Sequence, residues 1–474
     1  MWSKRKTELS EKDMRRRIIL CIGYVFTLIC FYHVDTSDNV RQGINLWEAI
    51  FTGSFFEFYS INLASQQSNQ MVSFANYDMF MNLILGLAQL PLFILEKVIG
   101  NNIQCYFWAR VYAKLVLLIP TWIAGTGMKK IAVQIGLDEE KAENVFFMFM
   151  SSAIMISSVC MVGQVDIVSL AFAIYALYFL LKGEEWKFVL LFVLSVQCKN
   201  FSFFLFAPIL LLKEKHVVKV AGKLLLPLVT MYLINLPFSV IDSIGVAAKR
   251  PRLWFMIDCM TRVRLSFLGV DIPVLIIAFV FVCIYAYLLP TPSKEDSVKW
   301  YLYMGLCGIL PILICQLSFP QWMVYILPMT TLLFFINDNT ENIMRRLLLE
   351  CAGTLSLLVG YLVRHQHAYN FDNMYGMLID KLIPLRGRTL YGLQEFNLKY
   401  TDEKYYQIWT ASYAVFLVWI VVFLINNYPN KKMVIQKTEA KKEIRGLLWL
   451  RAVGGFVLCN ISIILYCFQL LMTP

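Results

Sequence analysis

Charged residues are scarce in this sequence. Asp, Glu, Lys and Arg make up only 16% of its 474 residues, whereas 59% are hydrophobic and the mean hydropathy is +0.61. An ordinary soluble domain, in which about a quarter of the residues are charged, is therefore excluded. The chain instead contains many apolar runs of roughly 20 residues, which are long enough to cross a bilayer as helices. We predict an all-α polytopic membrane protein that forms a single domain over residues 1–474.

Several signals of soluble enzymes are also missing. The sequence has no Gly-rich phosphate-binding motif and no His/Cys set with metal-ligand spacing, so nucleotide donors and metal ions have no evident site. The pair His365 and His367 in "RHQH" is interpreted as part of a polar loop. No metal ligand or cofactor is assigned, and the participation of a divalent cation is left open.

The cysteines and the net charge say little about function. Most of the twelve cysteines lie inside apolar runs, where they behave as small buried hydrophobes rather than as a disulfide framework. The first apolar run is followed by "VDTSDN" and not by a small-residue cleavage site, so it is interpreted as a membrane anchor. The net charge of +11 is interpreted as a topology signal, and no nucleic-acid partner is predicted.

The positive-inside rule orients the chain. The basic segment "MWSKRKTELSEKDMRRR" predicts a cytoplasmic N-terminus and a first span at about 17–34 that runs outward. A long outer loop, 35–105, follows. We predict about 13 spans, the others lying at about 106–126, 144–162, 167–182, 187–198, 201–213, 221–238, 270–290, 299–317, 322–337, 347–363, 410–426 and 447–471.

One further apolar run, 79–100, is long enough to span but is left out of this count. If it crossed, the charged segment "GMKKIAVQIGLDEEKAEN" would lie outside and every later loop would be inverted. Leaving it out restores the excess of Lys and Arg on the cytoplasmic side. We therefore predict that 79–100 is embedded from the outer side, so that the first loop carries juxtamembrane helices on the outer face.

On the outer side, Asp35, Asp38 and Asp166 are candidate catalytic residues, and Asp78 and Gln164 are candidate substrate-binding residues. Asp35 and Asp38 follow the first span, and their alternative interpretation is a helix end exposed to water. Asp78 opens the embedded helix, where an N-cap is the alternative. Gln164 and Asp166 lie between two apolar runs, and an acid at a membrane boundary is costly unless it is solvated, paired or functional.

Cations on the outer side are unexpected and require an anionic partner, which could be a substrate phosphate or simply lipid headgroups. Lys199 lies in the tight turn "QCKNF", and the other cations lie in the outer segments 239–269 and 364–409. Those predicted to bind substrate are Lys249, Arg250, Arg252, Arg262, Arg264 and Arg364.

Outer acids and cations above a helical bundle predict a cleft that binds a lipid-linked phosphate and performs acid-base chemistry. Two other classes remain open. A transporter or flippase of lipid-linked sugars would place its charges deep within the spans, often in broken helices. An O-antigen polymerase or ligase would depend on a large late outer loop, for which 364–409 is a candidate.

The order of motifs resembles the C-type integral-membrane glycosyltransferases (GT-C), and among them the prokaryotic proteins related to the GPI mannosyltransferases. An acid follows the first span, and then come "LWEAIFTGSFFEFY", "ANYDMFMN", "GQVD" and "KNFSFFLFAP". The resemblance covers about the first 210 residues by motif and the rest only by its pattern of spans.

The resemblance implies a GT-C-like bundle that transfers a sugar with inversion, a mannose-like hexose being favoured. A polyprenyl-phosphate sugar would be the donor and a lipid-linked or cell-surface glycan the acceptor, on the outer face of a bacterial plasma membrane. Asp38 is implied as the general base, with Asp35 as second choice. Asp166 is implied as the acid of the second outer loop, and Lys199 as the lysine that faces the phosphate.

Overall fold

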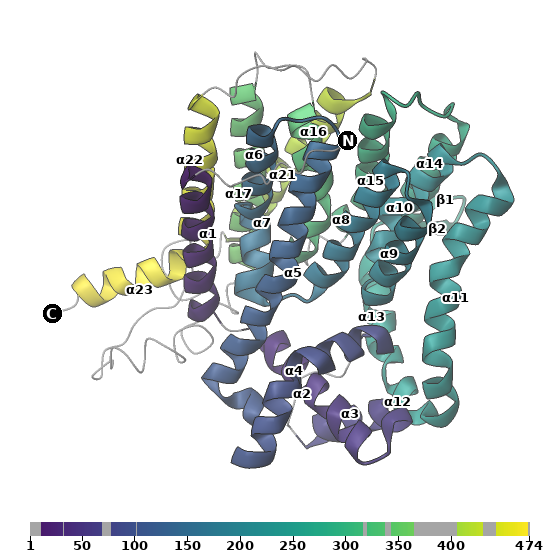
Figure 1. The fold of residues 1–474 in the computed structure, drawn as a ribbon, viewed down its shortest axis with the longest axis vertical. Helices are drawn as coiled ribbons and strands as arrows, with labels where there is room; N and C mark the ends of the chain where they lie inside the picture. Colours follow the sequence, from purple (N-terminus) through teal and green to yellow (C-terminus); the bar gives the residue numbers. More distant parts are fainter. Residues whose placement is uncertain are drawn as a thin grey trace, which may run out of the picture.

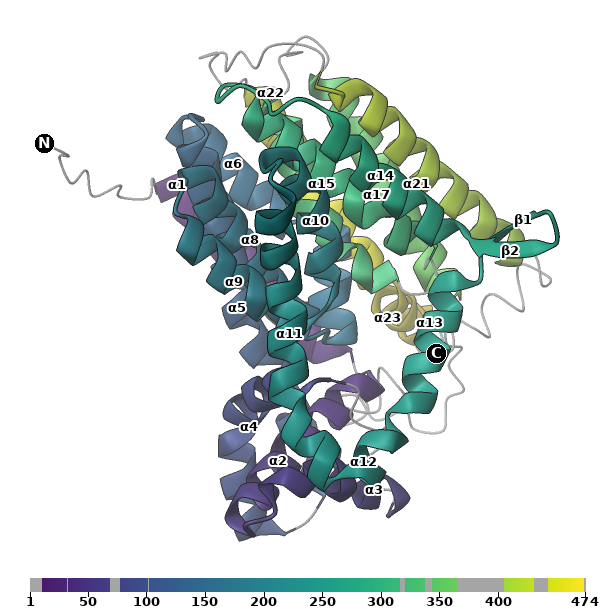
Figure 2. The same cartoon turned by 90° about the vertical axis from the view of Figure 1, so that its right-hand side faces the viewer.

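The computed structural model shows a helical protein whose helices form two groups. It describes residues 11–31, 33–68, 77–100, 102–315, 320–336, 343–364, 405–429 and 442–472. The larger group is a bundle of roughly parallel helices, and a smaller group lies below it in both views (Figures 1 and 2). The bundle contains α1 (Glu11–Cys30), α5 (Phe107–Gln134), α6 (Glu139–Met150), α7 (Ala153–Ile156), α8 (Asp166–Lys182), α9 (Glu185–Cys198), α10 (Phe201–Lys213), α14 (Val274–Leu288), α15 (Ser297–Ile314), α16 (Leu327–Ile336), α17 (Ile343–Arg364), α21 (Tyr405–Asn427) and α22 (Lys442–Cys459).

The smaller group is called here the α2–α4 group. It consists of α2 (Val34–Phe51), α3 (Phe58–Gln67), α4 (Met79–Ile99) and α12 (Ser243–Ala248). The long helix α11 (Val217–Ile241) runs from the bundle down to this group, and α13 (Arg250–Thr261) leads back toward the bundle (Figure 2). Short 3₁₀ or π segments are η1 (Phe55–Glu57), η2 (Ile103–Cys105), η3 (Ser157–Val162) and η4 (Pro320–Ile326), and α23 (Ile461–Met472) ends the described chain.

The described helices fit a membrane-embedded protein but do not confirm about 13 spans. Six of them are long and apolar enough to cross a bilayer, and the number rises to eight if two bent pairs each count as one span. Several predicted spans correspond to short helices, such as α9 with 14 residues and α10 with 13. At 1.5 Å per residue these reach only about 20 Å, which is less than the thickness of a hydrocarbon core.

Helix α4 passes the length and composition test for a span, yet it lies in the α2–α4 group below the bundle (Figure 1). It packs closely on α2: a Cβ on Gly86 would lie 2.3 Å from Leu46, and the indole of Trp47 donates to the Gly86 carbonyl at 2.7 Å. Arg41 of α2 also forms a bidentate pair with Glu96 of α4, both contacts being 2.9 Å. These contacts tie α4 to the helix that carries the first acids. That α4 does not cross the bilayer remains a prediction.

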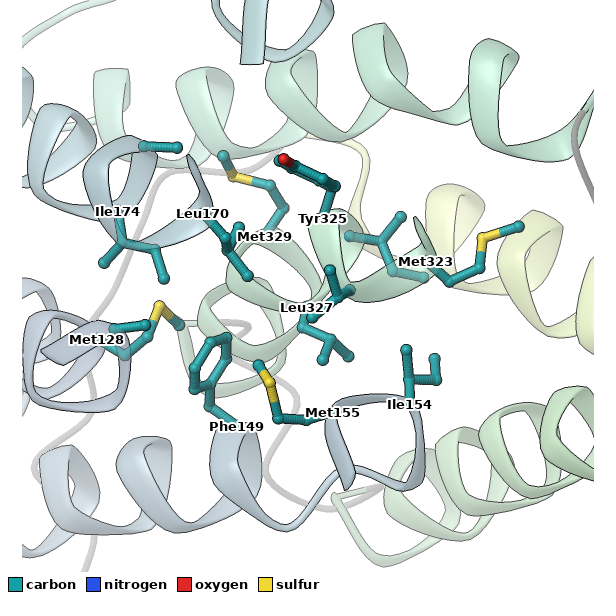
Figure 3. Close-up of a cluster of buried hydrophobic side chains, with 14 of the residues drawn as sticks. Met128, Phe149, Ile154, Met155, Leu170, Ile174, Met323, Tyr325, Leu327 and Met329 are labelled. Atoms are coloured by element: carbon teal, nitrogen blue, oxygen red, sulfur yellow. The ribbon is translucent and has the colours of Figure 1, made fainter. Parts of the chain in front are cut away.

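A continuous apolar core holds the bundle together (Figure 3). Met128 of α5, Phe149 of α6, Met155 of α7, Leu170 of α8 and Leu327 of α16 are all buried there. Because the side chains come from helices far apart in sequence, the core fixes the position of the helix ends that carry the polar residues.

One element was not predicted from the sequence. Strands β1 (Arg264–Phe267) and β2 (Val270–Pro273) form an antiparallel hairpin between α13 and α14. The late outer loop, by contrast, lies almost entirely beyond the described residues, since only 364 and 405–409 of 364–409 are described.

Candidate functional site

The turn between α1 and α2 places the first acid. The two helices meet at 89°, and Lys114 of α5 donates to the carbonyls of Leu28 and Phe31 at 3.1 and 2.6 Å. This contact satisfies carbonyls that the end of α1 would otherwise leave free. His33 caps α2, its Nδ1 accepting from the Asp35 amide at 3.3 Å. Asp35 therefore lies in the first turn of α2, where the helix dipole stabilises a carboxylate.

A second loop, Gly163–Asp166, meets this turn. The π segment η3 ends at Gly163, whose φ of +71° is the left-handed conformation that favours glycine. A Cβ at Gly163 would lie 2.8 Å from Thr36 Oγ1, so the loop and the first turn of α2 are in close contact. The side-chain amide of Gln164 donates to Asp35 Oδ2 at 2.9 Å. Two polar residues predicted independently from distant parts of the sequence are therefore hydrogen-bonded partners.

Asp166 and Lys199 form the next pair. Lys199 Nζ lies 3.2 Å from Asp166 Oδ1, and the Asp166 side chain is only 1% exposed. The contact is not aligned as a hydrogen bond, and both carboxylate oxygens lack a hydrogen-bond partner within the part of the chain that the structure describes. Lys199 Nζ also lies over the rings of Tyr77, Phe201 and Trp322, at 5.8, 5.3 and 5.0 Å from their centroids. A buried acid with spare acceptors thus faces a cation held in an aromatic cage.

Three buried serines connect the ends of the helices next to this pair by hydrogen bonds. Ser169 of α8 donates to the Ser195 carbonyl of α9 at 2.9 Å, and the hydroxyls of Ser195 and Ser202 lie 2.5 Å apart. These contacts join α8, α9 and α10 beside the positions of Asp166 and Lys199. Each hydroxyl is fully buried and hydrogen-bonded, so the network favours one arrangement of the three helix ends.

Asp78 and Lys249 form a third pair. Lys249 Nζ lies 3.3 Å from Asp78 Oδ1, 3.2 Å from the Tyr77 carbonyl and 4.4 Å from the centroid of the Tyr59 ring. Burial lowers the pKa of Lys249, and the neighbouring Asp78 carboxylate partly opposes that shift. Asp78 is the N-cap residue of α4, but its side chain makes no capping hydrogen bond to the described helix. Tyr77 contacts both lysines and so joins this pair to Asp166 and Lys199.

The two acids of α2 differ in accessibility. The Asp35 side chain is 31% exposed, whereas Asp38 is only 2% exposed. Arg41, one turn after Asp38 in α2, is also buried, and it is paired with Glu96. Of these two carboxylates, that of Asp35 is the one accessible to solvent.

Of the remaining predicted cations, the described side chains of Arg250, Arg262 and Arg264 make no contact with these pairs. Arg262 pairs with Asp258 on an exposed surface at 3.3 Å, and Arg264 donates to the Thr261 carbonyl at 3.1 Å. Both lie near the hairpin, at the opposite edge of the molecule from α4 in Figure 2. Arg250 is exposed at the start of α13. The side chains of Arg252 and Arg364 lie outside the described residues.

Lys114 is a polar residue of this region that the sequence-based prediction missed. It is almost fully buried within α5, a candidate span. An ionisable residue inside an apolar run was the available signal, because such residues are costly in a bilayer unless they have partners or a function.

An apolar cavity is lined in part by Thr36 and Val165, the sequence neighbours of Asp35 and Asp166. Its volume is about 290 Å³, and it is bounded by α4 and α5 together with Thr36, Gly163 and Val165. The lining residues Leu87 and Ile119 are 71% and 61% exposed, so the cavity opens on the apolar flank of these helices. The other apolar lining residues are Met81, Ile84, Leu85, Ala88, Ala113, Val116, Leu117, Pro120, Ile123 and Val168.

Comparison with known proteins gives no relative: no protein-family model, curated protein or solved structure matches the chain. The assignment of function therefore depends on the geometry and on the motif resemblance. Among the described residues, no three His, Cys, Asp or Glu side chains are grouped as a metal ion would require.

The close approach of Gly163 to Thr36 predicts an asymmetric effect of two alanine substitutions. Gly163→Ala and Gly183→Ala both force alanine to a positive φ, +71° and +82°, which costs roughly 1–2 kcal/mol each. Only at Gly163 does the new methyl group also collide with a neighbour, since no described atom lies within 4 Å of a Cβ at Gly183. We expect Gly163→Ala to lower the midpoint of thermal unfolding further than Gly183→Ala. Equal midpoints would contradict the close contact between the loop and α2.

Proposed function

We propose that this protein is a membrane glycosyltransferase of the GT-C type that uses a polyprenyl-phosphate sugar as donor. The observation that carries the proposal is that one loop, Gly163–Asp166, both contacts the acid of α2 and borders an apolar cavity. A lipid-linked sugar needs this combination, because its reactive end is polar and its carrier is a long hydrocarbon.

The cavity supports the carrier part of the proposal. Its lining is almost entirely apolar and opens between α4 and α5, so an isoprenoid tail can enter sideways from the bilayer. Burial of each CH₂ group contributes about 0.8 kcal/mol, so the tail supplies binding energy without polar contacts. The phosphate would then lie at the end of the cavity nearest Thr36 and Gly163.

Asp35 is proposed as the general base. Its carboxylate accepts the proton of an acceptor hydroxyl while the hydroxyl oxygen attacks the anomeric carbon of the donor sugar. The bond from that carbon to the phosphate oxygen breaks, its electron pair leaves with polyprenyl phosphate, and the configuration is inverted. The motif resemblance implies Asp38, but an acceptor hydroxyl has to reach the base, and the difference in exposure favours Asp35. Gln164 orients the carboxylate.

Lys199 and Lys249 are proposed to stabilise the departing phosphate. Each is already paired with one carboxylate, Asp166 or Asp78, and Tyr77 lies between them. A phosphate monoester can share such cations through charge-assisted hydrogen bonds, which strengthen as charge develops on the leaving oxygen. Asp166, whose side chain is buried, is proposed to hold Lys199 in position.

The sugar, proposed as a mannose-like hexose, and the acceptor, a lipid-linked or cell-surface glycan, follow the motif resemblance. The bacterial plasma membrane also follows the resemblance, whereas the cytoplasmic N-terminus and the outer position of the site follow the positive-inside rule.

The cavity can be tested by filling it. Ala88→Phe places a bulky side chain in the lining, whereas Leu95→Phe adds a ring on the same helix outside the cavity. We expect Ala88→Phe to raise the KM for a long-chain donor several-fold with little change in kcat, because the tail loses its place and the chemistry does not change. The KM for a donor with a short, water-soluble chain should change much less. If Leu95→Phe had the same effect as Ala88→Phe, the tail would bind elsewhere.

A further inference from the structure

The β1–β2 hairpin is an amphipathic element whose apolar face is largely exposed in the part of the chain that the structure describes, with Ile272 alone half-buried. Directly opposed residues of the two strands are Leu265 and Ile272, and then Phe267 and Val270. Because opposed residues lie on the same face of a hairpin, these four side chains form one apolar face. The other face of the hairpin is polar. There Asp271 accepts a hydrogen bond from Ser266 Oγ, and Arg264 lies on the same face.

The turn of the hairpin has an unusual residue at its tip. Leu268 and Gly269 have φ of +49° and +79°, the positive values at both central positions that a type I′ turn requires. Glycine and asparagine are favoured there, whereas a bulky leucine at positive φ is disfavoured by its own Cβ. Leu268 is nevertheless 88% exposed, the highest exposure of any large hydrophobic side chain that the structure describes. The tip is thus apolar at the expense of turn stability.

The hairpin also lies where a bilayer surface should be. Helix α14 follows β2 directly, and the Val274 amide bonds to the Val263 carbonyl at 2.9 Å, which fixes the base of the hairpin to the start of α14. Helix α14 has 15 residues and is about 22 Å long, about 8 Å short of a typical hydrocarbon core. Its other end is followed by the polar segment 291–298, so the shortfall lies on the hairpin side.

An isolated two-stranded hairpin is at best marginally stable in water. Here Leu265, Phe267 and Val270 are each more than half exposed, and the hairpin projects from the edge of the bundle in Figure 2. Burial of this apolar face in lipid would stabilise the hairpin and extend the short apolar surface of α14.

We propose that the β1–β2 hairpin inserts its apolar face and the Leu268 tip into the outer boundary of the bilayer, with Arg262 and Arg264 at headgroup depth. The arginines then neutralise anionic headgroups, and their long stems allow the charges to remain in water. This assigns the two cations to lipid rather than to the sugar donor, and it holds whether or not the protein transfers sugars.

The test uses the full-length protein in vesicles of phosphatidylcholine and phosphatidylglycerol. A small fluorescent amino acid is incorporated at position 268, or in a matched control at position 271 on the polar face. Quenching is measured with lipids that carry a nitroxide on the acyl chain, and separately with aqueous iodide. We expect lipid quenching to be several-fold stronger at 268 than at 271, and iodide quenching to be stronger at 271.

Two outcomes would overturn the proposal. Strong iodide quenching at 268 would mean that the tip lies in water, and the absence of quenching by either agent would mean that protein covers it. If the probe at 268 prevents folding, the same comparison is made with the probe at 265. Leu268→Asn provides an independent check, because it favours the turn and yet should weaken lipid quenching of a probe at 270.

Discussion

Asp35→Asn is expected to lower the rate of sugar transfer by roughly 10²–10⁴-fold, the usual contribution of a positioned general base. Asparagine keeps the shape of the side chain and an oxygen that can accept from Gln164, so the turn between α1 and α2 should keep its structure. The midpoint of thermal unfolding should change little, since Asp35 is partly exposed. The loss should appear in kcat, measured by release of polyprenyl phosphate from a saturating concentration of donor.

Asp38→Asn and Asp258→Asn are the controls for this prediction. Asp258 is exposed on α13 and pairs only locally with Arg262, so its replacement should leave transfer unchanged. Asp38→Asn should retain most of kcat if the protein stays folded. Should Asp38→Asn abolish transfer in a folded protein while Asp35→Asn does not, the preference implied by the motif resemblance would be correct and the one drawn from exposure would be wrong.

Arg451→Met is expected to destabilise the bundle by about 3–5 kcal/mol, the usual cost of leaving a buried charge without its partner. Arg451 of α22 forms two 2.6 Å contacts with Glu350 of α17, and both side chains are buried. It also donates to the Met148 carbonyl and to Ser151 Oγ, each at 2.9 Å, where α6 ends before α7. The change should appear as a lower midpoint of thermal unfolding in detergent.

The double variant Arg451→Met/Glu350→Leu separates charge from packing. Replacing a whole buried ion pair by apolar side chains of similar volume is often neutral or stabilising. The double variant should therefore be more stable than Arg451→Met alone. A double variant as unstable as the single one would show that the bonds of Arg451 to Met148 and Ser151 matter more than its pairing with Glu350.

Arg451 contacts the chain segment that leads to the candidate site. The chain runs from α6 through α7 and η3 to Gly163. The axis of α6 and the axis of the following α7–η3 segment differ by 49°. Arg451 bonds to the chain at that bend, where carbonyls lose their helical partners. We expect the variants of Arg451 to disturb the Gly163–Asp166 loop only through unfolding, so kcat per folded molecule should change little.

The sequence singled out polar residues that the structure brings into contact, but it did not show the geometry that joins them. Asp35 was noted as an acid that follows the first span, and Lys199 as a cation on the outer side. Gln164 and Asp166 were noted because an acid at the boundary of an apolar run is costly. Their pairing depends on the bends at the ends of α1 and η3, which are set by tertiary contacts such as that of Lys114. Such contacts join positions more than 80 residues apart and leave no local signal in the sequence.

The choice between Asp35 and Asp38 shows the same limit. The two acids are three residues apart in α2, and this spacing does not indicate which of them is buried. Packing of the neighbouring helices decides which of them is buried. The number of spans was also beyond the sequence pattern, because apolar runs such as 187–198 predict an apolar environment but not whether a helix crosses the bilayer.

The most direct test of the proposed activity is a reconstituted transfer assay. The purified protein in vesicles is given a polyprenyl-phosphate hexose and a glycolipid acceptor, and the products are followed by mass spectrometry and by NMR of the anomeric proton. We predict release of one polyprenyl phosphate for each sugar transferred, with inversion at the anomeric carbon. In Asp35→Asn, both the release of polyprenyl phosphate and the formation of the glycosylated product should fall sharply. Movement of intact donor across the bilayer without cleavage of its sugar–phosphate bond would contradict the account and would indicate a transporter.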